Sequence, residues 1–213
     1  MARVLICVVI ILIVSNSWAA ADIVTNGNFE TGLAGWAWTP TQYAEPEMVA
    51  SVVSSDEVFG DAGDCFRVNP GADFFHYMQG TEEGGVLSQS INLTAGIEYD
   101  VSVGGVAMQG LREVIDAGLI RLYIGDDLLW SWSVDLIAEG DTLYSSYSGT
   151  YTPDATASYD LELVLTRTYC NSSPSVYHYV DNVSITAVPE PTLLCLLSSL
   201  GMAGLLLRRR DSA

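Results

Sequence analysis

The chain has 213 residues, of which 26 are acidic, eight are arginine and none is lysine, and its formal net charge is −18. A chain this acidic lacks the basic surface that a phosphate backbone requires, which excludes nucleic-acid binding as its function. Its length allows one domain, and an aromatic content of 10% with a charged content of 16% excludes an intrinsically disordered protein.

The first 21 residues are predicted to be a secretory signal peptide. Arg3 precedes an apolar run, Val4 to Val14, that is short for a membrane span but typical of a signal-peptide core. Small side chains at Ala19 and Ala21 fit a cleavage site, so the mature protein is expected to begin at the next residue, Asp22. An uncleaved membrane anchor is the alternative.

Residues 22–187 are expected to form one all-β domain, an antiparallel β-sandwich. Apolar and polar side chains alternate in several short segments, each of which predicts a half-buried strand: 97–103, 120–124, 128–134 and 159–165. Turn-forming residues separate these segments, and roughly eight to ten strands at such short intervals are typical of a sandwich, most commonly a jelly roll. This domain holds 24 acidic residues and four arginines.

Two aromatic clusters are candidates for ligand binding, because loops on a rigid sandwich are common binding sites. Residues 74–77 are consecutive ring-bearing side chains that cannot all face one side of a strand, and a second cluster lies beside Pro40. The candidate ligand-binding residues are Trp36, Trp38, Phe75, His76 and Tyr77. Packing over the open ends of the sandwich is the alternative, whereas Trp130 and Trp132 share the parity of a buried strand face and are predicted to lie in the core.

Two cysteines, Cys65 and Cys170, belong to the predicted domain, since Cys7 and Cys195 fall in the terminal segments. An even pair in an exported domain suggests a disulfide. Two separately buried thiols are the alternative.

No sequence motif of a known catalytic centre is present. The two histidines, His76 and His178, have no neighbouring cysteine, and the many carboxylates are better explained as solvated surface charge than as a glycosidase pair. The protein is therefore predicted not to be an enzyme.

Three segments together resemble a known fold family. They are Ile23–Gly32 followed by Gly35-Trp36, Leu87–Ile91 followed by Ala95–Tyr99, and Tyr179–Ile185. These segments resemble the opening, central and closing strands of carbohydrate-binding modules with the galactose-binding-like jelly-roll fold. The resemblance implies that fold and a non-catalytic, carbohydrate-binding role, but it matches no sugar-contact motif and so implies no particular glycan.

Asp181 is a candidate calcium ligand. It shares the odd positions of Tyr177 and Ile185, so it is predicted to face into the sandwich if no bulge intervenes, and a buried carboxylate needs a cation or several donors. In the jelly rolls that the chain resembles, a structural calcium lies beside the paired first and last strands, which implies Glu30 and the backbone around Asn28 as further ligands. The alternatives are a bulge that turns Asp181 to solvent, or capping of backbone amides.

The C-terminal segment, residues 188–213, has three parts in order. Val188, Pro189, Glu190 and Pro191 precede the uncharged stretch 192–207, which is predicted to be a short transmembrane segment, and Arg208, Arg209 and Arg210 follow it. This order resembles the PEP-CTERM sorting signal of Gram-negative bacteria. The resemblance implies transient attachment to the inner membrane, processing by an exosortase, and release to the cell surface or extracellular matrix.

Two functions of different classes therefore remain. The first is an exported, non-catalytic carbohydrate-binding protein of the cell surface or exopolysaccharide. The second is a structural matrix or adhesion protein without a specific sugar ligand.

Overall fold

The structure is a computed structural model that describes residues 21–44, 48–72, 75–76, 80–168 and 175–189. The chain divides into two units, of which one comprises Asp22–Thr186 and the other the two terminal segments. No helix within the described segments is long and apolar enough to cross a membrane. The predicted transmembrane segment, 192–207, and nearly all of the predicted signal peptide lie outside the described residues.

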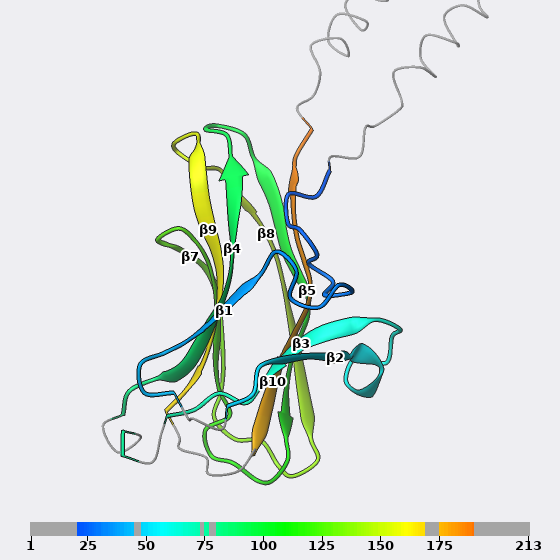
Figure 1. Ribbon diagram of the computed structural model, residues 1–213, viewed down its shortest axis with the longest axis vertical. Coiled ribbons are helices and arrows are strands. Elements are labelled where there is room, and N and C mark those ends of the chain that lie inside the picture. The colour runs from blue at the N-terminus through cyan, green and yellow to red at the C-terminus, as the bar shows by residue number, and fades with distance from the viewer. Residues whose placement is uncertain (1–20, 45–47, 73–74, 77–79, 169–174, 190–213) are drawn as a thin grey trace, which may run out of the picture. The chain divides into compact units, whose positions relative to one another are not determined.

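The described residues form ten strands in two five-stranded sheets (Figure 1). The sheet that we call the β4 sheet contains, in spatial order, β1 (Ala37–Pro40), β4 (Glu83–Leu93), β9 (Ala157–Arg167), β6 (Gly118–Ile124) and β7 (Asp127–Val134). The β10 sheet contains β2 (Ser51–Ser54), β3 (Asp64–Val68), β10 (Val176–Ala187), β5 (Tyr99–Gly110) and β8 (Thr142–Tyr151), and the 3-10 helix η1 (Ser55–Glu57) follows β2. The prediction of an all-β antiparallel sandwich is confirmed.

Alternation along the strands builds the core. In β9, Leu161, Leu163 and Leu165 are fully buried between the sheets, while Glu162 and Val164 lie half-buried on the outer face. Antiparallel pairing of β4 with β9 along their full lengths fixes this register, because a slip of one residue would turn every leucine outward. Each buried leucine stabilises the fold by roughly 1.5–3 kcal/mol.

The N-terminal loop is held against the last strand. Ile23 donates its backbone N–H to the Ile185 carbonyl at 2.8 Å. The Gln89 side chain in β4 bonds both backbone groups of Thr25, at 2.7 and 2.9 Å, and the Phe29 ring is fully buried in the core. The beginning of the domain therefore lies beside its closing strand.

Aromatic rings close the edge between β7 and β8. Trp130 and Trp132 occupy the positions of β7 that pair with the buried Leu122 and Ile120 of β6. The Trp130 ring lies 6.2 Å from that of Tyr147 in the other sheet. Both tryptophans face inward, as their parity predicts, but they are half-buried at this edge rather than part of the core.

Candidate functional site

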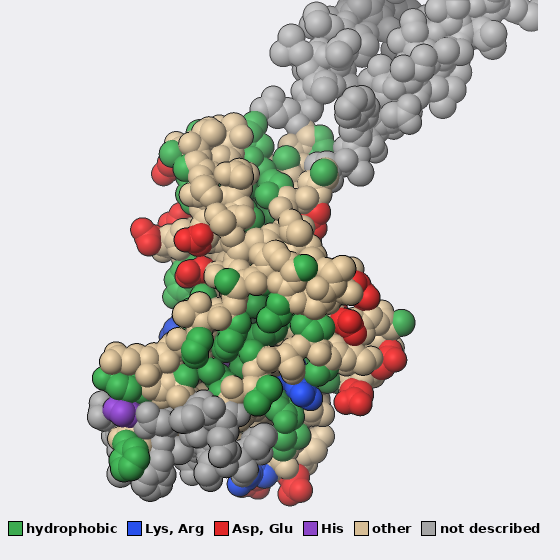
Figure 2. All heavy atoms as spheres, in the orientation of Figure 1, with side chains coloured by type: hydrophobic (Ala, Val, Ile, Leu, Met, Phe, Trp, Pro, Cys, Tyr) green, Lys and Arg blue, Asp and Glu red, His purple; other side chains and the backbone are tan. Residues whose placement is uncertain are grey.

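The arginines are informative because they are few. Figure 2 shows acidic side chains mainly along the two sides of the visible face and only small basic areas. Arg167 is buried, where it donates to the Asp116 carbonyl at 2.8 Å, and Arg121 forms an ion pair with Glu82 at 2.8 Å on the outer face of the β4 sheet. Arg67 differs from both, since it lies on the outer face of the β10 sheet without a carboxylate partner among the described residues.

Strand alternation and register gather Arg67 with two tyrosines. In β3 the Phe66 side chain points into the core, so the next residue, Arg67, points outward. In β10 His178 and Val180 are buried in the core, while Tyr177 and Tyr179 lie on the outer face. Tyr179 pairs directly with Arg67, which brings the guanidinium and both phenol rings together.

The Arg67 side chain is held in place by neutral groups. Its guanidinium carbon lies 4.6 Å from the centroid of the Tyr177 ring, a cation–π contact, and a terminal nitrogen donates to the Ser51 hydroxyl at 3.4 Å. Its Nε is buried and has no hydrogen-bond partner. The Tyr179 hydroxyl donates to the Gln109 side-chain oxygen at 2.9 Å, and burial raises the pKa of Tyr179 to about 12 although the Arg67 charge opposes that shift.

An exposed ring stands at the other end of the same face. Tyr144 of β8 pairs with Ala107 of β5 on the outer side of the sheet and is 59% exposed. Its hydroxyl donates to the Val58 carbonyl at 2.7 Å and its ring lies 6.3 Å from that of Phe59, so the segment after η1 fixes its orientation. From β3 to β8 the sheet spans three strand spacings, or about 14 Å.

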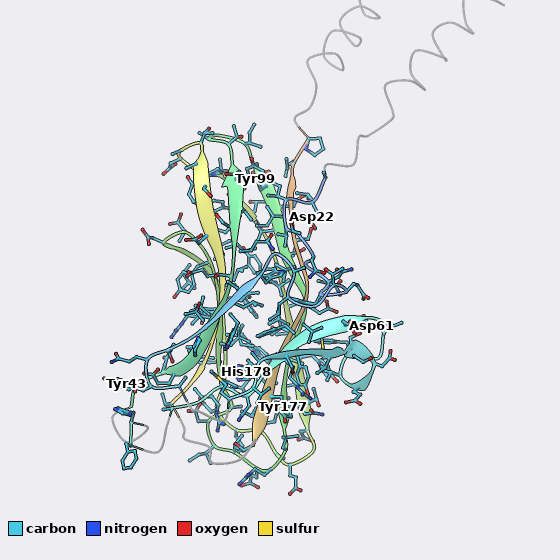
Figure 3. The ribbon with its side chains drawn as sticks, viewed as in Figure 1. Asp22, Tyr43, Asp61, Tyr99, Tyr177 and His178 are labelled. Atoms are coloured by element: carbon cyan, nitrogen blue, oxygen red, sulfur yellow. The ribbon has the colours of Figure 1, made fainter. Side chains whose placement is uncertain are left out.

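We call this surface the arginine–tyrosine face and define it by Arg67, Gln109, Tyr144, Tyr177 and Tyr179. It offers a fixed guanidinium, amide and hydroxyl groups, and one exposed ring, all on strands of one sheet. These are the groups that bind a polar ligand with apolar patches. Figure 3 shows Tyr177 among the side chains near the end of the sandwich, well apart from Tyr43.

The tryptophans of the predicted aromatic platform are packing residues in this structure. Trp36, a candidate ligand-binding residue, is only 7% exposed, because its ring packs on Phe29 at 5.6 Å and its indole N–H donates to the Asn26 carbonyl at 3.1 Å. Trp38 is half-buried in β1 rather than in a loop and lies 5.2 Å from the Phe66 ring, across the sandwich. For Trp36 the structure therefore matches the alternative, packing, rather than a ligand-binding position.

The predicted cluster at residues 74–77 contains an exposed ring. Phe75 is 80% exposed, and the His76 ring stacks on Tyr43 with centroids 3.7 Å apart. Tyr77 lies outside the described residues. Tyr43 escaped the sequence analysis because it is a single tyrosine in a stretch without alternation.

Asp181 lies on the outer face of the β10 sheet, not in the sandwich core. Asn182 adopts a left-handed conformation, φ 54°, and this irregularity shifts the parity of β10 after Asp181. The carboxylate is nevertheless buried, at 4% exposure, and accepts the Asn182 N–H at 2.7 Å. Burial, with the charges of Asp61, Glu30 and Asp64, raises the pKa of Asp181 to about 6.

The predicted calcium ligands are only partly gathered. Glu30 accepts the backbone N–H of Asp64 at 3.2 Å and contributes to the field at Asp181. Asn28 instead lines an open pocket of about 330 Å³ between the N-terminal loop and β10, together with Asn182. Within the described residues no three His, Cys, Asp or Glu side chains lie close enough together to hold a metal ion.

Cys65 is a free, buried thiol. It lies on the outer side of the β10 sheet, where it packs with Val58, Ala107 and Tyr179, and burial raises its pKa to about 12. Cys170 lies outside the described residues, so the disulfide stays a prediction. Of the sorting motif, Val188 and Pro189 are described, while Glu190, Pro191 and Arg208–Arg210 are not.

His178 is a core residue rather than an accessible base. It is fully buried, its Nε2 meets the Ala117 carbonyl at 2.7 Å, and burial lowers its pKa to about 3. An imidazole that stays neutral and out of reach of solvent has a structural role. Sequence reasoning had no means to place it, because histidine occurs on either face of a strand.

No protein-family model and no curated protein sequence matches this chain. Among solved structures, the chain is similar to the Stig cyclase Fisc from Fischerella sp. TAU, at 15% identity and a TM-score of 0.51 over 80% of this chain and 99% of that one. It is also similar to the CBM22-1-GH10 modules of Clostridium thermocellum xylanase 10B in complex with xylohexaose, at 15% identity and a TM-score of 0.49, covering 81% of this chain and 30% of that one.

A third similar structure is TmCBM61 in complex with β-1,4-galactotriose, at 14% identity and a TM-score of 0.46 over 79% of this chain and 100% of that one. At such identities a likeness concerns the fold alone. The likeness to the Stig cyclase supports the sandwich architecture.

Proposed function

We propose that this protein is an exported, non-catalytic carbohydrate-binding protein whose glycan lies across the arginine–tyrosine face. The observation that carries the proposal is the Arg67 guanidinium, fixed over the Tyr177 ring and beside Gln109 on a sheet face that also presents Tyr144. Amide and guanidinium groups match sugar hydroxyls, and an exposed ring of fixed orientation matches the apolar face of a sugar. Val58 and Phe59 cover the sheet between Arg67 and Tyr144, so a glycan that contacts both residues would pass over these side chains.

The rigidity of these groups supports binding of a chain without chemistry on it. Strands hold Arg67 and Tyr144, so little side-chain entropy is lost when a glycan binds. His178 does not lie on this face, because it is buried on the opposite side of β10. The resemblance of the three sequence segments to carbohydrate-binding modules agrees with the proposal.

Affinity electrophoresis against a panel of polysaccharides tests the proposal. We expect one glycan class to retard the full chain, and Tyr144→Ala to abolish the retardation. Phe75→Ala is the matched control, because Phe75 is also exposed but belongs to the other predicted platform. If only Phe75→Ala reduces retardation, the platform is the loop near His76. Uniform mobility in every gel favours the alternative, a structural matrix or adhesion protein.

We further propose that the protein reaches the cell surface or extracellular matrix through an exosortase that acts near Pro189. The order of the motif, the uncharged stretch and the arginines supports this proposal. Mass spectrometry of secreted protein should find a C-terminus close to Pro189. Recovery of intact Arg208–Arg210 peptides outside the cell contradicts it.

We also propose a structural calcium held by Glu30 and Asp181, with backbone oxygens around Asn28. The buried Asp181 carboxylate with acidic neighbours supports the proposal, since a cation would relieve their repulsion. Calcium should raise the melting temperature of the wild-type chain by several degrees relative to chelator. Asp181→Ala should remove the difference, and identical melting of the wild type in both conditions contradicts the site.

A further inference from the structure

The charge on Arg67 distinguishes it from an ordinary sugar-binding donor. The domain holds 24 acidic residues and four arginines, so an arginine could readily find a carboxylate partner. Arg121 does so on the outer face of the other sheet, where Glu82 lies 2.8 Å from it. Arg67 instead contacts the Ser51 hydroxyl and the Tyr177 ring and lies beside Tyr179, all neutral groups, and no carboxylate among the described residues forms an ion pair with it.

The same contacts orient the guanidinium. Tyr177 stacks against its plane, Ser51 accepts from one terminal nitrogen, and the buried Nε faces the protein. One terminal nitrogen is bonded to Ser51 and the other has no hydrogen-bond partner among the described residues, so the terminal end of the fork is the part that a ligand can approach. A planar pair of N–H donors matches the two oxygens of a carboxylate, and such charge-assisted bidentate pairs are about twice as strong as neutral hydrogen bonds.

We infer that the arginine–tyrosine face recognises a polysaccharide that carries carboxylates, that is, a glycan containing uronic acid. In this arrangement Arg67 binds one uronate carboxylate, Gln109 bonds neighbouring hydroxyl groups, and Tyr144 packs against a sugar further along the chain. This inference rests on the proposed function and names its ligand class. No covalent step is involved.

The negative charge of the domain opposes the binding of a negatively charged glycan. Asp181 and its acidic neighbours lie close to Arg67 and repel a polyanion, so the contact at Arg67 has to outweigh that repulsion, which salt weakens. The contact pair at Arg67 is partly shielded from solvent and is screened less. Recognition therefore depends on one oriented guanidinium rather than on a broad basic surface, which makes it specific for carboxylate position.

The test compares polygalacturonate with the same polymer after reduction of its carboxylates, by isothermal titration against the full chain at one calcium concentration. We expect the wild-type chain to bind native polymer at least tenfold more tightly than reduced polymer. Arg67→Lys keeps the charge but loses the planar fork, and should bring the two affinities within twofold of each other. Arg121→Lys is the matched control and should retain the wild-type preference.

A second variant keeps the test decisive if Arg67→Lys does not fold. Ser51→Ala removes one acceptor that orients the guanidinium and should lower the preference for native polymer two- to fivefold. Equal binding of both polymers by the wild type overturns the uronate inference while the proposed function stands. Failure to bind either polymer overturns the inference, and failure across the whole panel of polysaccharides overturns the proposed function as well.

Discussion

The two faces of strand β10 treat polar groups in opposite ways. On the inner face, His178 is neutral, because burial lowers its pKa to about 3, and the Ala117 carbonyl meets its Nε2. On the outer face, Asp181 is nearly as buried as His178, yet its pKa is raised only to about 6, so at neutral pH it carries a charge. Arg67 stands beside the same face, and no carboxylate in the described part of the chain pairs with it.

This difference separates residues that hold the sandwich together from residues that are available to a ligand. The polar side chain of the inner face, His178, is buried and hydrogen-bonded within the protein. The outer face holds two charged groups, Arg67 and Asp181, that no described neighbour neutralises. An unpaired charge in a partly buried place lowers stability, so its presence favours a binding role for the outer face. The following substitutions test this contrast.

Val180→Ala and Tyr177→Ala should have opposite consequences. Val180 is fully buried, so its truncation leaves a cavity and should lower the free energy of unfolding by about 2–3 kcal/mol without changing glycan affinity. Tyr177 is half-buried, and its truncation should cost roughly 1 kcal/mol but remove glycan binding, because Arg67 loses its stacking partner. Urea unfolding and titration of both variants check this; a larger stability loss for Tyr177→Ala contradicts the contrast.

His178 should make the fold sensitive to acid. Its folded-state pKa of about 3 lies below the ordinary value of 6.5, so the unfolded chain binds a proton that the folded chain rejects. Stability from this group is therefore present above pH 6.5 and is lost as the pH falls, by about 2–3 kcal/mol between pH 7 and pH 4.5.

The control for that prediction is His178→Gln, which puts a neutral amide at the same position. Urea unfolding at pH 7 and pH 4.5 should show a smaller acid-induced loss in His178→Gln than in the wild type. Equal losses in the two proteins indicate that the histidine is not held neutral.

Asp181 should respond to pH with the opposite sign. Its folded-state pKa of about 6 lies above the ordinary 3.8, so the folded chain binds the extra proton between these values, and stability is lost as the pH rises through 6. In chelator, Asp181→Asn should be more stable than wild type at pH 7.5, by on the order of 1 kcal/mol after solvent screening, and this difference should shrink as the pH falls through 6 and vanish below about pH 3.8. If Asp181→Asn is less stable at pH 7.5 even in chelator, the carboxylate already has a favourable partner.

The sequence predicted the sandwich well because its evidence is periodic. Segments such as 159–165 alternate without interruption, and the structure places their leucines between the sheets. The prediction placed Asp181 on the wrong face because it assumed that side chains alternate regularly along the whole strand. The left-handed Asn182 breaks it, and asparagine alone in a strand gives no warning of that.

The arginine–tyrosine face could not be predicted for a different reason. Arg67 and Tyr177 are 110 positions apart, and their contact depends on β3 pairing with β10 and on the register that sets Arg67 opposite Tyr179. The aromatic clusters were visible because their members are adjacent in sequence. Adjacency did not predict exposure, since Trp36 packs on Phe29 in the core.

The smallest expected effect concerns Tyr179→Phe. Tyr179 is 3% exposed, and its hydroxyl donates to Gln109 at 2.9 Å, so the substitution removes one hydrogen bond and keeps the packed ring. Because Gln109 is only half-buried, water can replace the lost donor, and the free energy of unfolding should fall by about 1 kcal/mol or less. Glycan affinity should fall about two- to threefold, since Gln109 is no longer oriented. Stability measured by urea unfolding and affinity measured by titration should therefore change together, whereas an unchanged affinity removes Gln109 from the binding face.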